Sequence, residues 1–231
     1  MISPTKVIVA LDTQDPAKLA KLFVALSGYP VWVKLGMEVF YSIGPKVIHE
    51  AKDKGFKIFL DLKLHDIPNT VEQGLKSLMR YPVDMINIHA AGGSEMMRRA
   101  SDAVKAKADA PLLIAVTQLT STTQSQMNNE QCIPDELTKN VMHLSRLARE
   151  AGCDGVVASP LEVKGIREIC GPDFKIVTPG IRPKGSEALD QKRYATPNEA
   201  ILLGSDFLVI GRPITGDPEH RLALEKILKG N

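Results

Sequence analysis

Short runs of apolar residues recur along the chain, and each run is nearly continuous in valine, isoleucine and leucine. There are eight such runs, at residues 6–11, 31–36, 57–64, 85–90, 112–117, 155–159, 175–180 and 207–211. A strand of a parallel sheet that is covered on both faces has this continuous pattern, whereas a half-exposed strand alternates apolar and polar residues. The runs therefore predict eight buried parallel strands.

Helix-start and helix-end signals lie between the apolar runs. Asp15 followed by Pro16 is typical of an N-cap and a first helical residue. Capping-box spacing occurs at Asn69 with Glu72, Ser159 with Glu162, and Thr196 with Glu199. Glycines near the expected helix ends are Gly28, Gly55 and Gly152. Strands alternating with helices over residues 1–231 predict a single-domain, closed (β/α)8 TIM barrel.

An open, doubly wound sheet is the alternative arrangement for alternating strands and helices. Such sheets often carry a dinucleotide-binding G-x-G-x-x-G sequence or a Walker A sequence after the first strand. This chain has neither sequence there. The pattern therefore favours the closed barrel.

Two of the expected connections are longer than ordinary barrel loops. They cover about residues 118–134 and about residues 182–197. Unstructured loops longer than about 12–15 residues are uncommon in compact domains and often act as lids. Both connections follow predicted strands, so both should lie at the carboxyl-terminal face, where barrel enzymes keep their active sites. We expect two lid loops there, with tolerated surface insertions as the alternative.

Polar residues, together with one glycine, collect at or just beyond the carboxyl ends of the predicted strands. They are Asp12, Lys34, Asp61, Lys63, His89, Thr117, Thr120, Ser159, Arg182, Gly211 and Arg212. In a closed barrel the carboxyl ends of all strands meet at one mouth. These residues, although scattered in the sequence, are therefore expected to converge there.

The stretch DLKLHDIPNT (61–70) carries more charge than a buried strand tolerates without compensation. Residues two apart on a strand share a face, so Asp61 and Lys63 should point into the barrel mouth while the neighbouring leucines pack against helices. Lys34 and Asp12 are the expected neighbours from the adjoining strands, and alternating aspartate and lysine side chains can keep each other ionised. We expect an active-site network, with an ion-pair cluster that only closes the barrel top as the alternative.

Arg182 and Arg212 each stand in a glycine-containing segment that follows one of the last two predicted strands, GIRP (180–183) and IGRPI (210–214). Barrels often bind a phosphate group with the loops after these two strands. An arginine offers a bidentate, permanently charged fork, and Gly211 lets the backbone approach an anion closely. This side of the mouth is therefore expected to bind phosphate.

Composition and charge narrow the class of protein. Basic and acidic residues are interspersed, and the formal net charge is +2. The sequence has no block of lysine and arginine of the kind that indicates a nucleic-acid partner. The apolar runs are far shorter than the roughly 18 residues that span a membrane, and no signal-peptide pattern precedes the first strand. The three cysteines are widely spaced and form neither a disulfide framework nor a metal pair. These features predict a cytoplasmic protein without nucleic-acid or membrane partners.

The stretch DLKLHDIPNT also resembles the D-x-K-x-x-D-I-x-N-T signature of the orotidine 5′-monophosphate decarboxylase family. Further family motifs follow in order, namely VALD, VKLG, NIHAAGG, TPGIRP, DQKRYATP and VIGRPI. The resemblance covers essentially the whole chain and is closest to the bacterial form. It implies a homodimer with shared active sites, and neither a metal nor an organic cofactor. The implied reaction converts orotidine 5′-monophosphate to uridine 5′-monophosphate and CO₂, the final step of de novo pyrimidine nucleotide biosynthesis.

The resemblance also implies roles for individual residues. Lys63 resembles the proton donor, and Asp61 resembles the carboxylate that lies beside the substrate carboxylate. Asp12 and Lys34 resemble residues that bind ribose hydroxyls, and Lys34 also belongs to the charge network. The remaining matches are Asp66, Ile67 and Thr70, which reach across the dimer into the partner's site; Thr120, Ser159 and Pro179, near the pyrimidine; and Gln191, Gly211 and Arg212, at the phosphate.

Two other functions fit parts of this pattern. One is a metal-dependent sugar-phosphate decarboxylase or epimerase. The sugar-acid decarboxylases of this group share D-x-K-x-x-D, but they are expected to carry an acidic metal ligand on the second strand, where this chain has Lys34. A cation beside a divalent metal is unfavourable. A non-catalytic nucleotide-binding barrel should have lost part of the aspartate–lysine network, which is complete here. The sequence therefore favours the metal-free decarboxylase.

Overall fold

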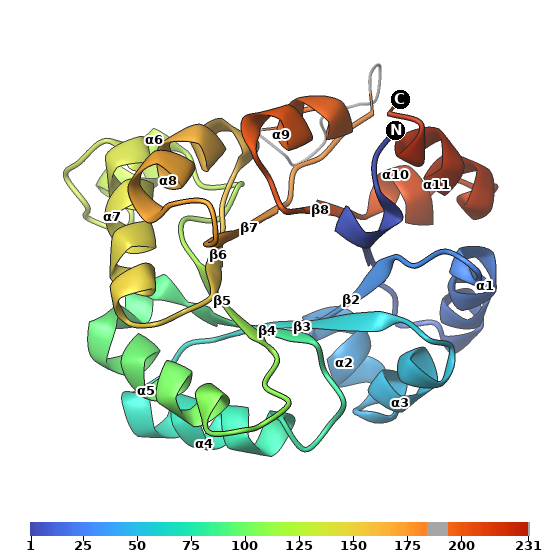
Figure 1. Cartoon of the computed structure of the whole chain (residues 1–231), viewed down its shortest axis with the longest axis horizontal. Coiled ribbons are helices and arrows are strands. Elements are labelled where there is room, and N and C mark those ends of the chain that lie inside the picture. The colour runs from blue at the N-terminus through green and yellow to red at the C-terminus, as the bar shows by residue number, and fades with distance from the viewer. Residues whose placement is uncertain (184–193, 231) are drawn as a thin grey trace.

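The computed structural model describes residues 1–183 and 194–230, and its strands form a closed parallel barrel. The strands pair in sequence order, and β1 pairs with β8 to close the ring, which the helices surround (Figure 1). The strands are β1 (Val7–Ala10), β2 (Trp32–Gly36), β3 (Lys57–Leu64), β4 (Met85–His89), β5 (Leu112–Val116), β6 (Gly155–Val157), β7 (Lys175–Thr178) and β8 (Phe207–Ile210). The predicted (β/α)8 barrel is confirmed, and the closing β1–β8 pair excludes the open sheet.

Helices and short 3₁₀ segments connect the strands. The helices are α1 (Pro16–Leu26), α2 (Met37–Ile43), α3 (Lys46–Asp53), α4 (Pro68–Leu78), α5 (Gly93–Lys105), α6 (Gln124–Asn129), α7 (Leu137–Glu150), α8 (Val163–Cys170), α9 (Pro197–Leu203), α10 (Arg212–Thr215) and α11 (His220–Leu228). The 3₁₀ segments are η1 (Pro4–Lys6), η2 (Ala90–Gly92) and η3 (Pro160–Glu162). No described helix is long and apolar enough to cross a bilayer.

Three of the four predicted helix starts are confirmed. Asp15 caps α1 by accepting a hydrogen bond from the Ala17 N–H, and the capping boxes at Ser159 and Thr196 both form. The capping box predicted at Asn69 is wrong.

The helix that contains Asn69 begins two residues earlier than predicted, at Pro68, with Ile67 as its N-cap. Proline favours the first helical position because its φ angle is fixed and its missing N–H needs no partner there. Glu72 is therefore free to pair with Lys76 and Arg99 on the outer surface instead of with a backbone N–H.

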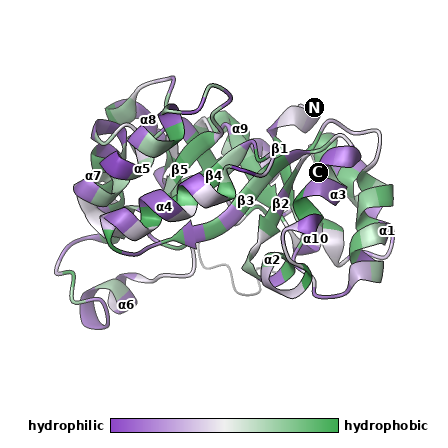
Figure 2. Cartoon of the chain, turned by 90° about the horizontal axis from the view of Figure 1, so that it is seen from below, coloured by the Kyte–Doolittle hydropathy of each residue, from purple (hydrophilic) through white to green (hydrophobic). Residues whose placement is uncertain are grey.

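The apolar core has two parts that the strands separate. Inside the barrel lie Ile8, Ala10, Trp32, Phe59, Met85, Ile114, Val177 and Val209. A larger cluster fills the space between strands and helices, and it includes Leu60 and Leu62 of β3. Hydrophobic residues accordingly dominate the strands and polar residues the outer helix faces, while α6 projects away from the barrel (Figure 2).

An aspartate precedes each of β4, β6 and β8 and binds the strand before it. A carboxylate oxygen of Asp84, Asp154 and Asp206 accepts a hydrogen bond from the backbone N–H of Ile58, Leu113 and Ile176, each at 2.8 Å. Burial of a backbone N–H is costly unless it has a partner. The aspartates therefore fix the amino-terminal ends of neighbouring strands, at the face opposite the predicted mouth.

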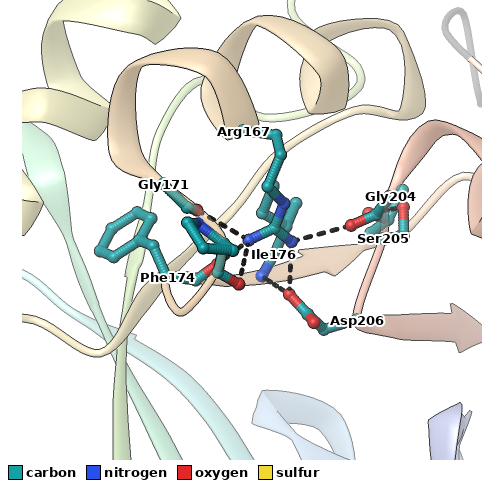
Figure 3. A network of polar contacts seen from close by, with 9 residues as sticks. Arg167, Gly171, Phe174, Ile176, Gly204, Ser205 and Asp206 are labelled. Carbon is teal, nitrogen blue, oxygen red and sulfur yellow. Dashed lines mark hydrogen bonds and ion pairs between the residues drawn. The ribbon is translucent and has the colours of Figure 1, made fainter.

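Arg167 extends this arrangement at the start of β7 and β8 (Figure 3). Its guanidinium donates to Asp206 at 2.8 Å and to the backbone oxygens of Gly204 and Phe174 at 2.8 and 2.7 Å. It also lies within hydrogen-bond distance of the Gly171 and Pro172 carbonyls. One side chain thus joins α8 to the loops before both strands.

Arg167→Ala is expected to lower the free energy of unfolding by roughly 1–3 kcal/mol, because it leaves partly buried carbonyl groups and Asp206 without their donor. Chemical denaturation measures this loss. Lys164→Ala, an exposed change on the same helix, is the control and should shift the midpoint little. Equal stability of the two variants would contradict the structural role of Arg167.

Candidate active site

The mouth at the carboxyl ends of the strands contains two connected cavities. One, of about 280 Å³, is lined by Ala10, Asp12, Lys18, Lys34, Pro179, Gly180, Arg182, Val209, Gly211, Arg212, Thr215 and Gly216. The other, of about 210 Å³, is lined by Lys34, Phe59, Asp61, Lys63, Val116, Gln118, Leu119, Thr120, Ser121, Val157, Pro179 and Val209. Lys34, Pro179 and Val209 line both, so the two cavities form one elongated site with Lys34 between its halves.

Asp61 and Lys63 lie at the end of β3, where the strand departs from regular geometry. Lys63 has φ +50°, in the left-handed region that residues other than glycine rarely adopt. The pairing of β3 with β4 also shifts register between Leu60 and Leu64. Leu60 and Leu62 still pack outward, and both charged side chains line the cavity, as the alternation had predicted.

Four charged side chains from β3, β2 and the end of β1 form a continuous network. The Lys34 Nζ lies 3.0 Å from Asp12 Oδ1 and 3.2 Å from Asp61 Oδ2. The Lys63 Nζ lies 2.7 Å from Asp61 Oδ1. Positive and negative groups thus alternate in the order Asp12, Lys34, Asp61, Lys63, and no member faces only groups of its own sign.

The network keeps its buried members ionised. Burial alone would raise the pKa of Asp61, but the charges of Lys34 and Lys63 outweigh burial and lower that pKa below its ordinary value. Burial would likewise lower the pKa of Lys34, and the charges of Asp61 and Asp12 instead raise it. At neutral pH the cavity therefore presents fixed charges rather than neutral acid and amine groups.

Gly36 and Asn87, to which the sequence analysis assigned no role, hold this network together. A Cβ atom at Gly36 would lie 2.8 Å from Lys34 Nζ and 3.1 Å from Asp12 Oδ1, so a larger residue there would displace the ends of both side chains from this position. Asn87 is fully buried on β4 and donates from Nδ2 to Asp61 Oδ1 at 2.6 Å. The Asn87 Oδ1 accepts from the Lys63 backbone N–H at 2.8 Å.

Two histidines lie beside the network. The His65 and His89 rings stack with centroids 5.4 Å apart. Burial lowers the pKa of His89, and the neighbouring charges of His65 and Lys63 lower it further, so its imidazole is neutral at pH 7. Neither histidine lines the two cavities. They therefore remain supporting residues rather than part of the cavity wall.

The first cavity has a cationic end. Arg182 and Arg212 line it from the loops after β7 and β8, and Lys18 lines it from α1. Burial lowers the pKa of Arg182, and the positive charge of Arg212 lowers it further. Arginine remains charged despite such a shift. This end therefore favours a multiply charged anion.

Some of the predicted site residues lie outside these cavities. Asp66, Ile67 and Thr70 are exposed at the start of α4, where the Asp66 carboxylate accepts from the Ile67 N–H. Ser159 is fully buried and caps η3 through the Leu161 N–H. Gln191 lies outside the described residues. Their predicted roles at a substrate stay predictions.

The predicted lid loops are only partly described. Residues 118–134 contain α6, which begins with a capping box between Thr123 and Gln126, so the segment is not without secondary structure. Its first part supplies Leu119, Thr120 and Ser121 to the second cavity. Most of residues 182–197 lies outside the described part of the chain. A lid function for either segment stays a prediction.

Within residues 1–183 and 194–230, no group of three or more histidine, cysteine, aspartate and glutamate side chains is placed to hold a metal ion. The position beside Asp61 on β2 is instead filled by the Lys34 ammonium.

Comparison with known proteins gives consistent matches. The model of the family described as "Orotidine 5'-phosphate decarboxylase / HUMPS family" matches residues 5–227. The chain is 49% identical over 232 residues to orotidine 5′-phosphate decarboxylase of Moorella thermoacetica, covering 98% of this chain and 92% of that protein. It is 47% identical over 233 residues to the enzyme of the same name from Halalkalibacterium halodurans, covering 99% and 98%. The crystal structure of orotidine 5′-phosphate decarboxylase from Lactobacillus acidophilus superposes with a TM-score of 0.85 at 43% identity, over 97% of each chain.

Proposed function

This chain belongs to the orotidine 5′-phosphate decarboxylase / HUMPS family, and on that premise we propose that it decarboxylates orotidine 5′-phosphate. The products are uridine 5′-phosphate (UMP) and CO₂, and the reaction is the last step of de novo pyrimidine nucleotide biosynthesis. The observation that carries the proposal is the ionised Lys34–Asp61–Lys63 network in a cavity whose far end is cationic.

The shape of the site supports one orientation of the nucleotide. The 5′-phosphate lies at the cationic end, near Arg182 and Arg212. The ribose lies beside Asp12 and Lys34, where carboxylate and ammonium groups can bind hydroxyls. The pyrimidine then enters the second cavity and places its carboxylate toward Asp61 and Lys63.

Lys63 is the proton donor in this proposal. When the bond between the ring carbon and the carboxylate breaks, CO₂ leaves and the electron pair stays on the ring carbon. The Lys63 ammonium stabilises the developing negative charge and transfers a proton to that carbon, which yields UMP and a neutral amine. The amine then regains a proton from water. Asp61, 2.7 Å from the ammonium, holds it in the cavity before the reaction.

Asp61 has a second effect on the substrate. Its carboxylate is fixed in the negative form by Lys34 and Lys63, so a substrate carboxylate placed beside it is repelled. That repulsion disappears as neutral CO₂ forms, and it therefore opposes the ground state more than the transition state. Binding of the distant phosphate offsets the cost of bringing the two carboxylates together.

We also propose that the chain acts as a homodimer with shared active sites. The exposed Asp66, Ile67 and Thr70 lie outside the cavity of their own chain, and Ile67 has an exposed fraction of 66%, which is high for a large apolar residue. In the dimer these residues enter the partner's site, where Asp66 extends the alternating network beyond Lys63.

Mixing two inactive variants tests the shared site. Lys63→Ala and Asp66→Ala are each expected to be nearly inactive alone. In a mixed dimer, one site combines the intact Lys63 of one chain with the intact Asp66 of the other, so exchange of subunits should restore activity. Size-exclusion chromatography establishes the dimer first. If the protein is a dimer but the mixed variants stay inactive, Asp66 does not contribute to the partner's site.

Arg212→Ala is expected to raise KM for orotidine 5′-phosphate by at least about 10-fold, because a charge-assisted bond to phosphate contributes roughly 1.5–3 kcal/mol. Orotidine, which lacks the phosphate, should be converted equally slowly by the variant and the parent protein. Arg146→Ala, an exposed change on α7, is the matched control. Equal losses with both substrates would remove Arg212 from the phosphate site.

A metal-dependent sugar-acid decarboxylase is the second candidate, because such enzymes share the D-x-K-x-x-D sequence that residues 61–66 carry. The position of Lys34 disfavours it. Its Nζ lies 3.0–3.2 Å from both Asp12 and Asp61 and so occupies the place between the carboxylates that a cation would need. A divalent ion there would meet a positive charge. Full activity with a chelator is the expected result, and complete loss would favour this candidate.

We further propose that the enzyme works in the cytoplasm without nucleic-acid or membrane partners. Its three cysteines are free thiols, and Cys153 and Cys170 are buried. Burial raises the pKa of the Cys153 thiol to about 12, so that thiol is unreactive at neutral pH. Free thiols fit a reducing compartment.

A further inference from the structure

Asn87 is an uncharged residue in contact with the charged network. It lies in the middle of β4, has no exposed surface, and is surrounded in sequence by the apolar residues of that strand. An amide buried this completely is costly unless its donor and acceptor both have partners. Both have one here, and each partner belongs to the proposed catalytic machinery.

The two partners fix the orientation of the amide. The Asp61 carboxylate can only accept, and it receives a hydrogen bond from Asn87 Nδ2 at 2.6 Å. The Lys63 backbone N–H can only donate, and it reaches Asn87 Oδ1 at 2.8 Å. The nitrogen must therefore face Asp61, and the oxygen must face Lys63. No other uncharged side chain of this length offers a donor and an acceptor two bonds apart.

The Lys63 backbone needs such a partner. Its φ of +50° is unfavourable for a lysine, and it falls where β3 and β4 lose their regular pairing. The strand hydrogen bond that a regular register would give the Lys63 N–H is replaced by the Asn87 side chain. The same conformation aims the Lys63 ammonium at Asp61.

We propose that Asn87 is a positioning residue that sets the backbone conformation of Lys63 and the orientation of the Asp61 carboxylate through one amide group. The role goes beyond the family signature, since Asn87 touches neither cavity and acts through residues that do. The inference rests on the proposed function for its effect on catalysis. Its effect on the Lys63 ammonium can be measured without turnover.

Asn87→Asp and Asn87→Leu separate the two hydrogen bonds. Asn87→Asp keeps an oxygen for the Lys63 N–H but replaces the donor to Asp61 with a second carboxylate. It should raise the pKa of Asp61 and so shift the acid limb of the kcat/KM profile to higher pH. Asn87→Leu loses both bonds, and kcat should fall by about 100-fold, the size expected for misplacing a reacting group by about 1 Å. KM and UMP affinity should change much less in both variants.

Asn198→Asp, an exposed change on α9, controls for the added charge. Thermal unfolding and UMP binding establish that each variant is folded. If one of the variants does not fold, Asn87→Ser is used in its place. In parallel, the ¹³Cε resonance of Lys63 is recorded, and Asn87→Leu should shift it, because the Lys63 backbone and its Asp61 partner both lose the contact that fixes them. Folded variants with parental kcat and an unchanged pH profile would overturn the proposal. A shifted Lys63 resonance in a protein that does not convert orotidine 5′-phosphate would instead reject the proposed reaction and keep the role of Asn87.

A separate observation concerns the cationic end of the first cavity. Lys18 lies in the first turn of α1 and lines the cavity together with Arg182 and Arg212. None of the ion pairs found among the described residues involves Lys18, whereas Lys34 at the other side of the cavity is held by two carboxylates. We infer that Lys18 is a third cation for the 5′-phosphate, an inference that also rests on the proposed function.

Binding of UMP and of uridine to Lys18→Gln, measured by calorimetry, tests this role without turnover. UMP should bind about 3- to 10-fold more weakly, as expected for one partly exposed charge pair, while uridine binding should not change. Lys21→Gln, an exposed change on the same helix, is the matched control. Unchanged UMP affinity, or equal losses for UMP and uridine, would overturn the inference. A parent protein that binds UMP no better than uridine would reject the phosphate site itself.

Discussion

Replacing Lys63 with alanine is expected to abolish turnover of orotidine 5′-phosphate while nucleotide binding largely persists. The change removes both the proton donor and the cation that stabilises charge on the ring carbon. Enzymes lower barriers by about 8–23 kcal/mol, and a carbanion without good delocalisation needs the upper part of that range. Lys63 is the ammonium proposed to act directly on that carbon, and it is only partly buried, with 28% of its side chain exposed.

Single-turnover assays and UMP binding measure the two halves of this prediction. UMP affinity should stay within about 10-fold of the parent value, because phosphate and ribose contacts supply most of the binding. Lys54→Ala, an exposed change after α3, is the control and should keep full activity. If Lys63→Ala retained near-normal kcat, the proton-donor role would be wrong.

Replacing Asp61 with asparagine is expected to reduce kcat at least about 10³-fold, since preorganised charge is usually the largest contribution to catalysis. The change keeps the size of the side chain but leaves Lys34 and Lys63 without the carboxylate between them. The two ammonium groups then repel each other, so the pKa of Lys34 should fall. Kinetics at saturating substrate, compared with the exposed change Asp53→Asn, measure the loss.

The same variant should be less stable at neutral pH. Breaking a buried ion pair by removing one partner costs about 3 kcal/mol or more. The folded-state pKa of Asp61 is lowered, so its contribution to stability is present above the ordinary carboxyl pKa and is lost as pH falls through the lowered value. Denaturation curves of the parent and Asp61→Asn should therefore converge in acid. A difference in the free energy of unfolding between the parent and Asp61→Asn that stays constant down to the lowest pH would contradict the charge network.

The strands could be predicted because a strand that is buried on both faces has a nearly continuous sequence of valine, isoleucine and leucine. The predicted runs extended one or two residues too far at several carboxyl ends. Thr117, Ser159 and Pro179 lie beyond the last paired residues of β5, β6 and β7, where the chain turns to form the mouth and the helix caps. Composition alone does not distinguish a residue that ends a strand from one that begins a turn.

The aspartates before β4, β6 and β8 are a feature that the sequence does contain. Asp84, Asp154 and Asp206 each stand directly before an apolar run. Each could have been read as a strand-end signal, yet an isolated aspartate is also an ordinary turn residue. Only the hydrogen bonds to the neighbouring strands identify their shared function.

The charged part of the candidate site followed from the two-residue period of β3, which put Asp61 and Lys63 on one face. The residues that support this charged part could not be predicted from the sequence. Asn87 carries no charge and no spacing rule assigns it a partner, and the closeness of Gly36 to the Lys34–Asp12 ion pair depends on where those two side chains meet in space. The left-handed backbone of Lys63 is likewise invisible in the sequence, because lysine normally avoids that conformation.

An absorbance assay of the purified protein with orotidine 5′-phosphate, with and without a chelator, tests the central claim most directly. The account predicts that the substrate band disappears at the same rate in both samples, with UMP as the product, and that Lys63→Ala stops the reaction. An unchanged substrate band in the parent protein, or activity that the chelator abolishes, would contradict it.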